Sequence, residues 1–402
     1  MAARSDKPRL VCYGHNMSFI ILKPGKERRL IAGHSWIYAG EIAAVHDKAK
    51  DGDPVEIFDH RKRSLGVGLI NRKSQITVRR FTTQKEELDK AFFRRRLQAA
   101  AAYREPADAQ RLVFSEGDQL PGLILDRFGD CLVLQALTLG IDQRKPMLIE
   151  LARELFKPKA IVERSDAPTR KLEGLTETKG VIFGETDGNV VINVGGVRFA
   201  ANLLEDQKTG FFLDQAVNYQ EMLRFCSGKR VLDCFSYHGG FALYAAQAGA
   251  TTVEAVEISE AAVVRARQNA ELNGLLGKID FTCANAFDIL KKYDVEKRQF
   301  DVIVLDPPTF TRTKQNVDDA LRGYKEINLR ALKMLVPGGV LATFTCSHHI
   351  STELLRAVVV DAAADAHKTV RLVKTLTQNA DHPILPAIPE TEYLKGFLLQ
   401  VI

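Results

Sequence analysis

The chain has 402 residues, 46% of them hydrophobic and 26% charged, which is typical of a folded protein of about two or three domains. It has no apolar run of about eighteen residues and no apolar core near its start, so we expect neither a membrane span nor a secretory signal. Its six cysteines lie far apart without a Cys-x-x-Cys pair, which disfavours a zinc site and a disulfide framework and favours a reducing, cytoplasmic setting.

Positive charge is concentrated in the N-terminal part. Residues 1–106 hold 22 Lys and Arg against 12 Asp and Glu, whereas the remaining 296 residues hold 34 against 38. A basic N-terminal part favours a polyanionic partner, with nucleic acid first. A solvated basic surface explains the same charge equally well.

Residues 17–85 contain short runs of β-strand character separated by turn residues, and they predict a small β-barrel or sandwich. In the run "SQITVRRF", Ile76 and Val78 alternate with polar residues such as Thr77, which predicts one buried and one wet face. We interpret residues 1–16 as a short N-terminal extension.

The rest of the chain divides into two regions. Residues 86–198 predict a linking helix and then an α+β domain with hairpin-like turns such as "DRFGD". Over residues 199–402, strand-like and helix-like segments alternate, among them "RVLDCF", "GGFALYAAQAG", "TVEAVEIS", "EAAVVRARQNAELNG" and "FDVIVLD". This alternation predicts an α/β fold with a doubly wound parallel sheet.

The segment "VLDCFSYHGGF" places a strand, a tight loop and a helix in order, at the edge where doubly wound sheets bind ligands. Gly239 and Gly240 let the backbone approach a ligand and let the helix start tightly. Glu257 ends the next strand and can accept hydrogen bonds from ribose hydroxyls, while Asp233 can face a cationic or amino group. A Gly-x-Gly-x-x-Gly fingerprint is absent, which disfavours a nicotinamide dinucleotide and favours S-adenosylmethionine, a cofactor with a ribose but no phosphates.

The third strand of this region ends in "TCANAF". Asn285 can hydrogen-bond the adenine amino group, and Ala286 and Phe287 can line the pocket around the ring. A position in the core explains Phe287 as well.

The fourth strand ends in "VIVLDPPTF", where Asp306 is followed by Pro307 and Pro308. Two prolines make a rigid turn, and with Asp306 they present polar groups to a planar substrate that carries N–H groups. Phe310 can stack on an extruded base. The pattern is typical of nucleobase methyltransferases, although the tripeptide alone also occurs in ordinary loops.

The fifth strand ends in "TCS", which brings Cys346 to the same edge as Asp306. Carbon 5 of a pyrimidine is a weak nucleophile, and addition of a thiolate at carbon 6 activates it. Such covalent catalysis needs an activated cysteine. The alternative for Cys346 is a small buried apolar residue. His348 and His349 lack a third ligand at suitable spacing, so we expect no metal site.

Several segments together resemble the bacterial large-subunit ribosomal RNA cytosine-C5 methyltransferases that carry an N-terminal PUA domain. They include "RRLIAGHSWIYAGEI", "SEGDQLPGLILDRFGD", "EDQKTGFFLDQ", "VLDCFSYHGGF", "LDPPTF" and "FTCSHH". The resemblance covers nearly the whole chain from about residue 17. It implies a PUA domain over residues 17–85, a central α+β domain over 86–198 and a Rossmann-like class I methyltransferase domain over 199–402.

The resemblance also implies the cofactor, S-adenosylmethionine, and the roles of single residues. Cys346 would be the nucleophile, Asp306 would hold the N3/N4 edge of the cytosine, and residues 207–212 would cover the site. The cofactor-binding residues expected are Lys208, Thr209, Asp233, Phe235, Ser236, Tyr237, Gly239, Gly240, Glu257, Ile258, Asn285, Ala286, Phe287 and Asp306. The substrate-binding residues expected are Pro307, Pro308, Phe310 and Phe211.

We therefore predict an enzyme that forms 5-methylcytosine in large-subunit (23S) ribosomal RNA, with that RNA as partner, no membrane, and a homodimer as one option. Two alternatives stay open. One is methylation of a guanine or adenine nitrogen with Cys346 in a structural role. The other is a non-catalytic RNA-binding assembly factor.

Overall fold

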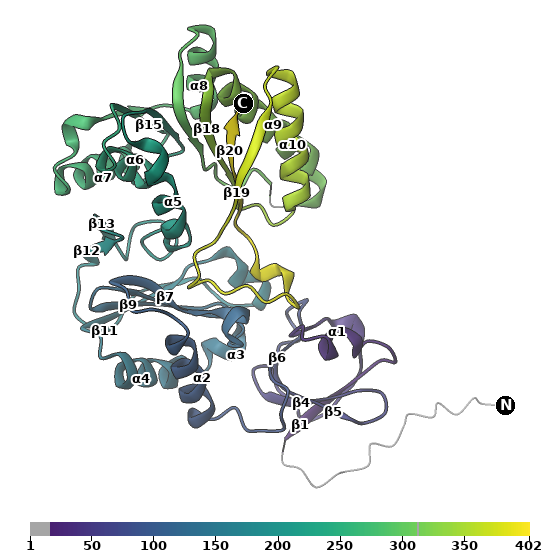
Figure 1. Ribbon diagram of the computed structural model, residues 1–402. Coiled ribbons are helices and arrows are strands. Elements are labelled where there is room, and N and C mark those ends of the chain that lie inside the picture. Colours follow the sequence, from purple (N-terminus) through teal and green to yellow (C-terminus); the bar gives the residue numbers. More distant parts are fainter. Residues whose placement is uncertain (1–16, 312) are drawn as a thin grey trace.

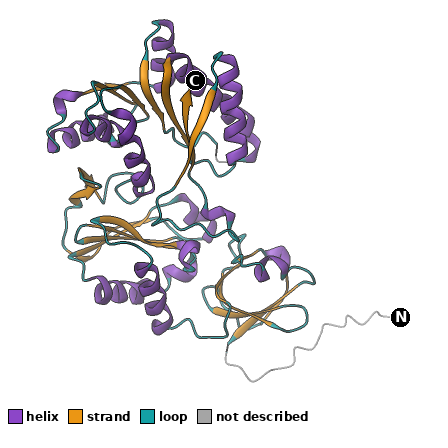
Figure 2. Cartoon of the chain, viewed as in Figure 1, coloured by secondary structure: helices purple, strands orange, loops and turns teal. Residues whose placement is uncertain are grey.

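The computed structural model describes residues 17–311 and 313–402, so the predicted extension of residues 1–16 lies outside the described residues. The strands form sheets of six, five, two and seven members. Figure 1 shows the chain as a first body (purple), a middle body (blue) and a third body (teal to yellow). Strands dominate the first body, whereas helices flank the sheets of the other two (Figure 2).

The first body is a curled sheet in the order β2-β6-β5-β4-β1-β3, with one short helix. Apolar side chains from different strands meet inside it; Ile20, Val55 and Val78 are each 0% exposed. Its elements are β1 (Ser18–Leu22), α1 (Arg28–Ile31), β2 (Trp36–Ile37), β3 (Ile42–Val45), β4 (Pro54–Phe58), β5 (Ser64–Ile70) and β6 (Val78–Thr82).

The predicted alternation around Ile76 is wrong in part. The strand begins only at Val78, and Thr77 is buried rather than wet, with its hydroxyl donating to a backbone carbonyl at 3.2 Å. Arg80 is buried too, and its guanidinium donates a hydrogen bond to Leu30 O at 2.8 Å. Polar groups are tolerated inside this sheet where nearby carbonyls satisfy them.

The middle body is a sheet in the order β11-β10-β9-β8-β7. Helices α2 and α4 bury apolar residues such as Phe93 and Leu151 against it. Asp89 begins α2 by accepting a hydrogen bond from Phe92 N at 2.8 Å. Its elements are α2 (Lys90–Ala102), β7 (Ala109–Phe114), β8 (Leu123–Phe128), β9 (Cys131–Ala136), α3 (Leu139–Asp142), α4 (Lys145–Phe156), β10 (Ala160–Ser165) and β11 (Thr178–Gly184).

A two-stranded hairpin, β12 (Asn189–Val194) and β13 (Val197–Asn202), follows the middle sheet. It crosses the boundary predicted between residues 198 and 199. Ala200 N donates to Asn269 Oδ1 of the third body at 2.8 Å, so the hairpin is docked there.

The third body confirms the predicted α/β fold. Its sheet has the order β16-β15-β14-β17-β18-β20-β19, parallel from β16 to β18, with β20 and β19 antiparallel. Neighbouring residues of one strand face opposite helical layers: Val231 packs with α5, α6 and α7, and Leu232 packs with α8, α9 and α10. Its elements are α5 (Ala216–Cys226), β14 (Arg230–Cys234), α6 (Gly240–Gln247), β15 (Thr252–Glu257), α7 (Glu260–Leu272), β16 (Ile279–Cys283), α8 (Ala286–Val295), β17 (Phe300–Leu305), α9 (Val317–Met334), β18 (Leu335–Thr345), α10 (Thr352–Asp365), β19 (Val370–Thr377) and β20 (Lys395–Val401).

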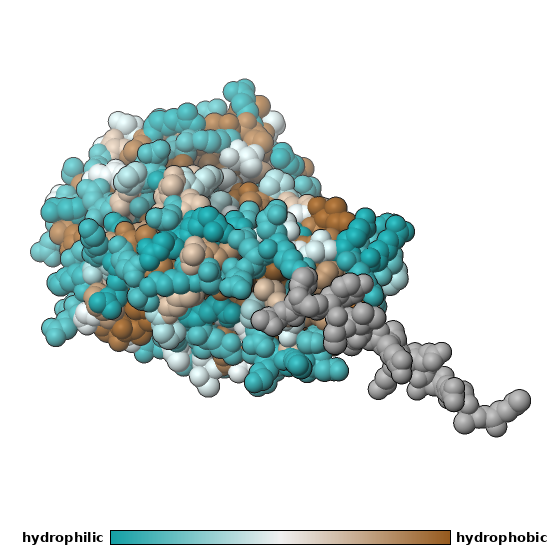
Figure 3. All heavy atoms as spheres, turned by 90° about the horizontal axis from the view of Figure 1, so that it is seen from below, coloured by the Kyte–Doolittle hydropathy of each residue, from teal (hydrophilic) through white to brown (hydrophobic). Residues whose placement is uncertain are grey.

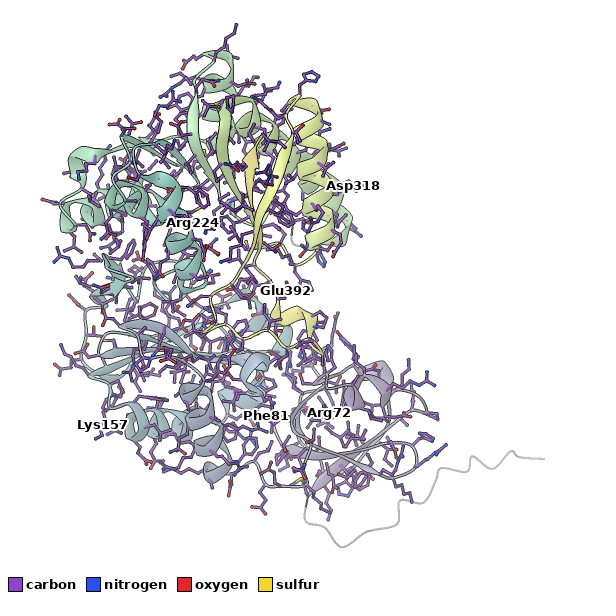
Figure 4. The ribbon with its side chains drawn as sticks, in the orientation of Figure 1. Arg72, Phe81, Lys157, Arg224, Asp318 and Glu392 are labelled. Carbon is purple, nitrogen blue, oxygen red and sulfur yellow. The ribbon has the colours of Figure 1, made fainter. Side chains whose placement is uncertain are left out.

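Residues 378–394, which we call the connecting segment, leave β19 and return as β20 after touching the other two bodies. In the middle body, Arg111 N donates to Asp381 Oδ2 at 2.8 Å. In the first body, His34 Nε2 lies 3.3 Å from Glu390 Oε2. Figure 4 labels Glu392 on this segment, where it runs between the third body and the others.

Among the described residues, no helix is both long and apolar enough to span a membrane. Figure 3, which views the molecule from below, shows a mainly hydrophilic face with scattered hydrophobic residues.

The middle body depends on a buried ion pair. Arg111 Nε and Nη2 donate to Asp126 Oδ1 and Oδ2 at 2.7 and 2.8 Å, and Asp126 is 0% exposed. The hydroxyl of Thr209 donates to the same carboxylate at 2.6 Å. The pair therefore joins the middle sheet to the segment that enters the third body.

We predict that Arg111→Met lowers stability by about 3–5 kcal/mol, because it leaves the Asp126 charge buried without its partner. The exposed pair of Arg322 and Asp319 provides the control, since its side chains are 75% and 73% exposed and Arg322→Ala should leave stability almost unchanged. Urea unfolding, followed by circular dichroism, measures both. Equal midpoints for the two variants would contradict the prediction.

Candidate active site

The loop between β14 and α6 is held by the side chain of Glu257. Its carboxylate oxygens accept from Tyr237 N at 3.0 Å and from Ser259 N at 2.9 Å. Phe235 and Tyr237 adopt φ values of 64° and 47°, which non-glycine residues rarely do. Glu257 therefore fixes an unusual loop at the carboxyl edge of the sheet, beside any ribose that it would bind.

The two glycines of the loop are needed for packing. A Cβ on Gly240 would lie 2.6 Å from the ring of Tyr219, and one on Gly239, at a φ of 81°, would lie 3.3 Å from Ala266. Neighbouring side chains thus account for both glycines, which allow α6 to start tightly as predicted.

Two oxygens near this loop are buried without a hydrogen-bond partner among the described residues: Asp233 Oδ1 and Ser236 Oγ. The other oxygen of Asp233 accepts from Ala242 N at 3.0 Å. Burial, reinforced by the Asp306 and Glu257 charges, raises the pKa of Asp233 well above its usual range. Such unsatisfied oxygens fit a site that a polar cofactor completes.

The predicted adenine side is apolar. The rings of Phe235 and Phe287 lie edge to face at 6.3 Å, and Ile258 is 66% exposed. Asn285 starts α8, with Oδ1 accepting from Phe287 N at 2.9 Å, while Ala286 is buried. The oxygen of Asn285 therefore uses one lone pair for capping, and the predicted hydrogen bond from the adenine amino group would use the other. Together with the loop, these residues fit S-adenosylmethionine.

Asp306 follows β17 and is held by a chain of amides. Gln215 Nε2 donates to Asp306 Oδ2 at 2.9 Å, and Asn218 Nδ2 donates to Gln215 Oε1 at 2.6 Å. Asn218 also donates to Thr377 O at 2.9 Å. Burial, followed by the charge of Asp214, raises the pKa of Asp306 to about 7.

Sequence reasoning missed Gln215 and Asn218, which are 2% and 1% exposed. Gln215 ends the "FFLDQ" segment, and Asn218 lies in the first turn of α5. The sequence signal that could have identified them is a pair of amide side chains among the apolar residues at the start of α5.

Cys346 lies just after β18, half-buried, with Sγ 3.1 Å from Thr309 Oγ1. In the parallel pair, Leu305 lies opposite Thr343, so both strands end at the same edge. Burial raises the pKa of the Cys346 thiol, and the nearby Asp306 carboxylate raises it further. The structure therefore brings the predicted nucleophile and the predicted carboxylate together.

Lys208 forms an ion pair and a cation–π contact with neighbouring side chains. Its Nζ lies 2.6 Å from Asp214 Oδ2 and 4.1 Å from the ring centroid of Phe212. Tyr393 donates its hydroxyl to the same oxygen of Asp214 at 2.6 Å. Although burial opposes this, the Lys208 ammonium holds the pKa of Asp214 below its ordinary value.

Two predicted site residues have side chains that face away from the site. The hydroxyl of Thr209 is buried against Asp126, as described above. Phe211 is 3% exposed, because its ring packs in the core at 4.8 Å from Phe199. The structure does not support the cofactor and substrate contacts predicted for these two side chains. Phe310 packs on Tyr324 of α9 at 4.5 Å and on Phe287, on the predicted adenine side, at 5.7 Å.

The turn after Asp306 has mixed exposure, with Pro307 buried and Pro308 exposed. The rings of His348 and His349 lie 5.4 Å apart. Among the described residues, no group of three or more His, Cys, Asp or Glu could hold a metal ion.

We predict that Asp306→Asn stabilises the protein at pH 8 by about 1–2 kcal/mol and has no effect at pH 4. A raised pKa means that the folded state holds this proton more tightly than the unfolded chain does. The stability of the parent protein therefore falls as the pH rises from about 4 to about 7. Asparagine cannot ionise and still accepts from Gln215.

Urea unfolding at the two pH values measures this effect. Asp301→Asn on the same strand is the control, because the hydrogen bond from Arg230 lowers the pKa of Asp301. Asp301→Asn should therefore lose stability at pH 8. A similar loss for Asp306→Asn would disprove the prediction.

Comparison with known proteins agrees with this geometry. Residues 20–83 match a PUA-like domain, and residues 180–399 match an S-adenosylmethionine-dependent methyltransferase family. The chain is 40% identical over 392 residues to the ribosomal RNA large subunit methyltransferase I of Klebsiella pneumoniae (strain 342), covering 95% of this chain and 98% of that protein. It is 43% identical over 392 residues to the protein of that name from Shewanella denitrificans, covering 95% and 99%.

Solved structures share the fold at lower identity. A protein described as a methyltransferase, complexed with SAH, has a TM-score of 0.83 at 19% identity and covers 96% of this chain and 100% of its own. A SAM-dependent methyltransferase from Streptococcus mutans has a TM-score of 0.82 at 19% identity, with the same coverage. With the family match, the fold and the loop fix the cofactor as S-adenosylmethionine. The chain belongs to the S-adenosylmethionine-dependent methyltransferases, in the family of ribosomal RNA large subunit methyltransferase I.

Proposed function

We propose that this enzyme methylates large-subunit (23S) ribosomal RNA and forms 5-methylcytosine through a covalent bond between Cys346 Sγ and carbon 6 of the base. The observation that carries the proposal is the half-buried thiol beside the Asp306 carboxyl group at the ends of β17 and β18. The names of the relatives support the choice of RNA.

The two side chains have complementary tasks. The Cys346 thiolate adds to carbon 6, and the Asp306 carboxyl group donates a proton to N3 as negative charge develops there. A pKa of about 7 keeps a large fraction of Asp306 protonated at neutral pH. Gln215 donates to Oδ2 of Asp306 and so leaves Oδ1 for the base.

Carbon 5 becomes nucleophilic after this addition, and bound S-adenosylmethionine supplies an electrophilic methyl group to it. Removal of the carbon 5 proton by a base then restores the C5–C6 double bond and expels the Cys346 thiolate. The methyl group replaces that proton, N3 returns its proton to Asp306, and Cys346 is left as the thiolate that began the cycle.

The first body offers phosphate contacts far from the base. His60 Nδ1 lies 3.9 Å from Glu27 Oε2, which brings the turn between β4 and β5 beside α1. Cations in these two segments attract RNA phosphates whatever the base sequence. The exposed basic residues in this turn, in the segment leading into α1 and at the start of α1 include Lys23, Lys26, Arg28, Arg61, Lys62 and Arg63.

We predict that Cys346→Ala abolishes methyl transfer to 23S ribosomal RNA, with a loss of at least about a thousandfold, while S-adenosylmethionine binding persists. Cys226→Ala is the matched control, because Cys226 is a buried cysteine in α5 and should leave activity near normal. Mass spectrometry of digested RNA identifies the methylated nucleoside.

Each outcome assigns the chemistry. Loss of 5-methylcytosine in Cys346→Ala alone supports the proposal. Methylation of a purine nitrogen that survives in Cys346→Ala would replace it with a structural role for the thiol. Absence of methyl transfer by the parent enzyme, on naked RNA and on ribosomal particles alike, would favour an RNA-binding assembly factor.

A further inference from the structure

We propose that Lys208 stabilises the thiolate of Cys346, and that Asp214 and Tyr393 position its ammonium group for this task. The inference rests on the proposed function, in which Cys346 is the nucleophile. It replaces the cofactor contact predicted for Lys208 with an electrostatic role toward the reacting sulfur.

Lys208 is held in one place by its surroundings. Its ammonium lies 2.6 Å from Asp214 Oδ2 and over the ring of Phe212 at 4.1 Å. Its backbone has a φ of 54°, a left-handed conformation that costs a lysine energy and persists only where neighbours enforce it. Its side chain is 38% exposed, so the charge is anchored and still partly accessible to solvent.

Asp214 is the anchor. Its side chain is 4% exposed, and its Oδ2 accepts both from Lys208 and from the hydroxyl of Tyr393. A buried carboxylate needs a cation, so moving the ammonium into solvent would leave that charge unpaired. Tyr393 belongs to the connecting segment, and Asn379 N of the same segment donates to Asp214 O at 2.8 Å. The ammonium is thus fixed from two directions.

The anchor also adjoins the catalytic pair. Asp214 directly precedes Gln215, whose amide lies 2.9 Å from Asp306 Oδ2, and Asp306 and Cys346 end neighbouring strands. Lys208 is therefore linked to Asp306 through Asp214 and Gln215, and Asp306 ends the strand beside that of Cys346. Its charge lowers the pKa of the Cys346 thiol and that of Asp306, against the opposing effect of burial on each.

Other charged and polar groups also face the thiol. Asp306 and Asp214 disfavour the thiolate, whereas the Thr309 hydroxyl favours it. Lys395 of β20 and Tyr324 of α9 interact with Cys346 as well. Lys395 is buried, and its Nζ donates to Tyr393 O at 3.3 Å. Two acidic side chains therefore oppose ionisation of Cys346, and the cations Lys208 and Lys395 act against them.

The experiment measures the ionisation of Cys346 directly, without methyl transfer. The full-length protein is alkylated with iodoacetamide from pH 6 to pH 10, and the rate at Cys346 is read from its tryptic peptide by mass spectrometry. Lys208→Met should shift the profile to higher pH and slow alkylation at pH 7 about threefold to tenfold. Lys208→Arg, which keeps the charge, should restore most of the rate. Tyr393→Phe should give a smaller shift in the same direction.

Lys374→Met is the matched control, because Lys374 forms an exposed ion pair of the same length, 2.6 Å, with Glu221. It should leave the alkylation profile unchanged. Equal profiles for Lys208→Met and the parent, together with weaker S-adenosylmethionine binding in Lys208→Met, would overturn the inference and restore the cofactor role. An unchanged profile in Tyr393→Phe would remove Tyr393 from it.

Failure of the proposed function looks different. If Cys346→Ala kept methyl transfer, the thiol would be structural even where Lys208→Met shifts its ionisation. If Cys346→Ala lost activity and Lys208→Met left the ionisation unchanged, only the role of Lys208 would be wrong.

Discussion

Burial of two carboxylates in one network governs the active site. The Asp214 charge acts on Asp306, and Asp214 is buried while Asp306 is partly buried. The hydrogen-bond partners of the two carboxyl groups differ, so their pKa values move in opposite directions. Asp214 receives the Lys208 ammonium and the Tyr393 hydroxyl and stays ionised, whereas Asp306 receives one amide N–H from Gln215 and holds its proton up to about pH 7. One anionic anchor and one proton donor result from two identical side chains.

The same network joins the third body to the other two. Tyr393 and Asn379, which hold Asp214, belong to the connecting segment, and that segment also contacts Arg111 in the middle body and His34 in the first. The connecting segment therefore links the carboxylate that anchors Lys208 to both other bodies.

The sequence predicted what depends on local order. Glu257, Asp306 and Cys346 each follow or end a strand, and parallel strands bring their carboxyl ends to one edge whatever the details of packing. Thr209 and Phe211 were wrong for the opposite reason, because neighbours in an irregular segment face different sides and only the packing of Asp126 and Phe199 decides which. Tyr393 was missed because it reaches Asp214 from 179 residues away along the chain.

The raised pKa values of Cys346 and Asp306 have one further consequence. The addition step needs a thiolate and a protonated carboxyl group at the same time. The raised pKa of Asp306 favours the protonated carboxyl group, whereas the raised pKa of Cys346 opposes the thiolate. Because the two side chains interact, a proton that leaves Cys346 relieves the cost of a charged Asp306 if Asp306 receives it. The pair then titrates as a unit. A cation that stabilises the Cys346 thiolate, but is too weak to ionise Asp306, favours the reactive state with a thiolate and a protonated carboxyl group. Lys208, neutralised largely by Asp214 and partly exposed, is a cation of this moderate kind.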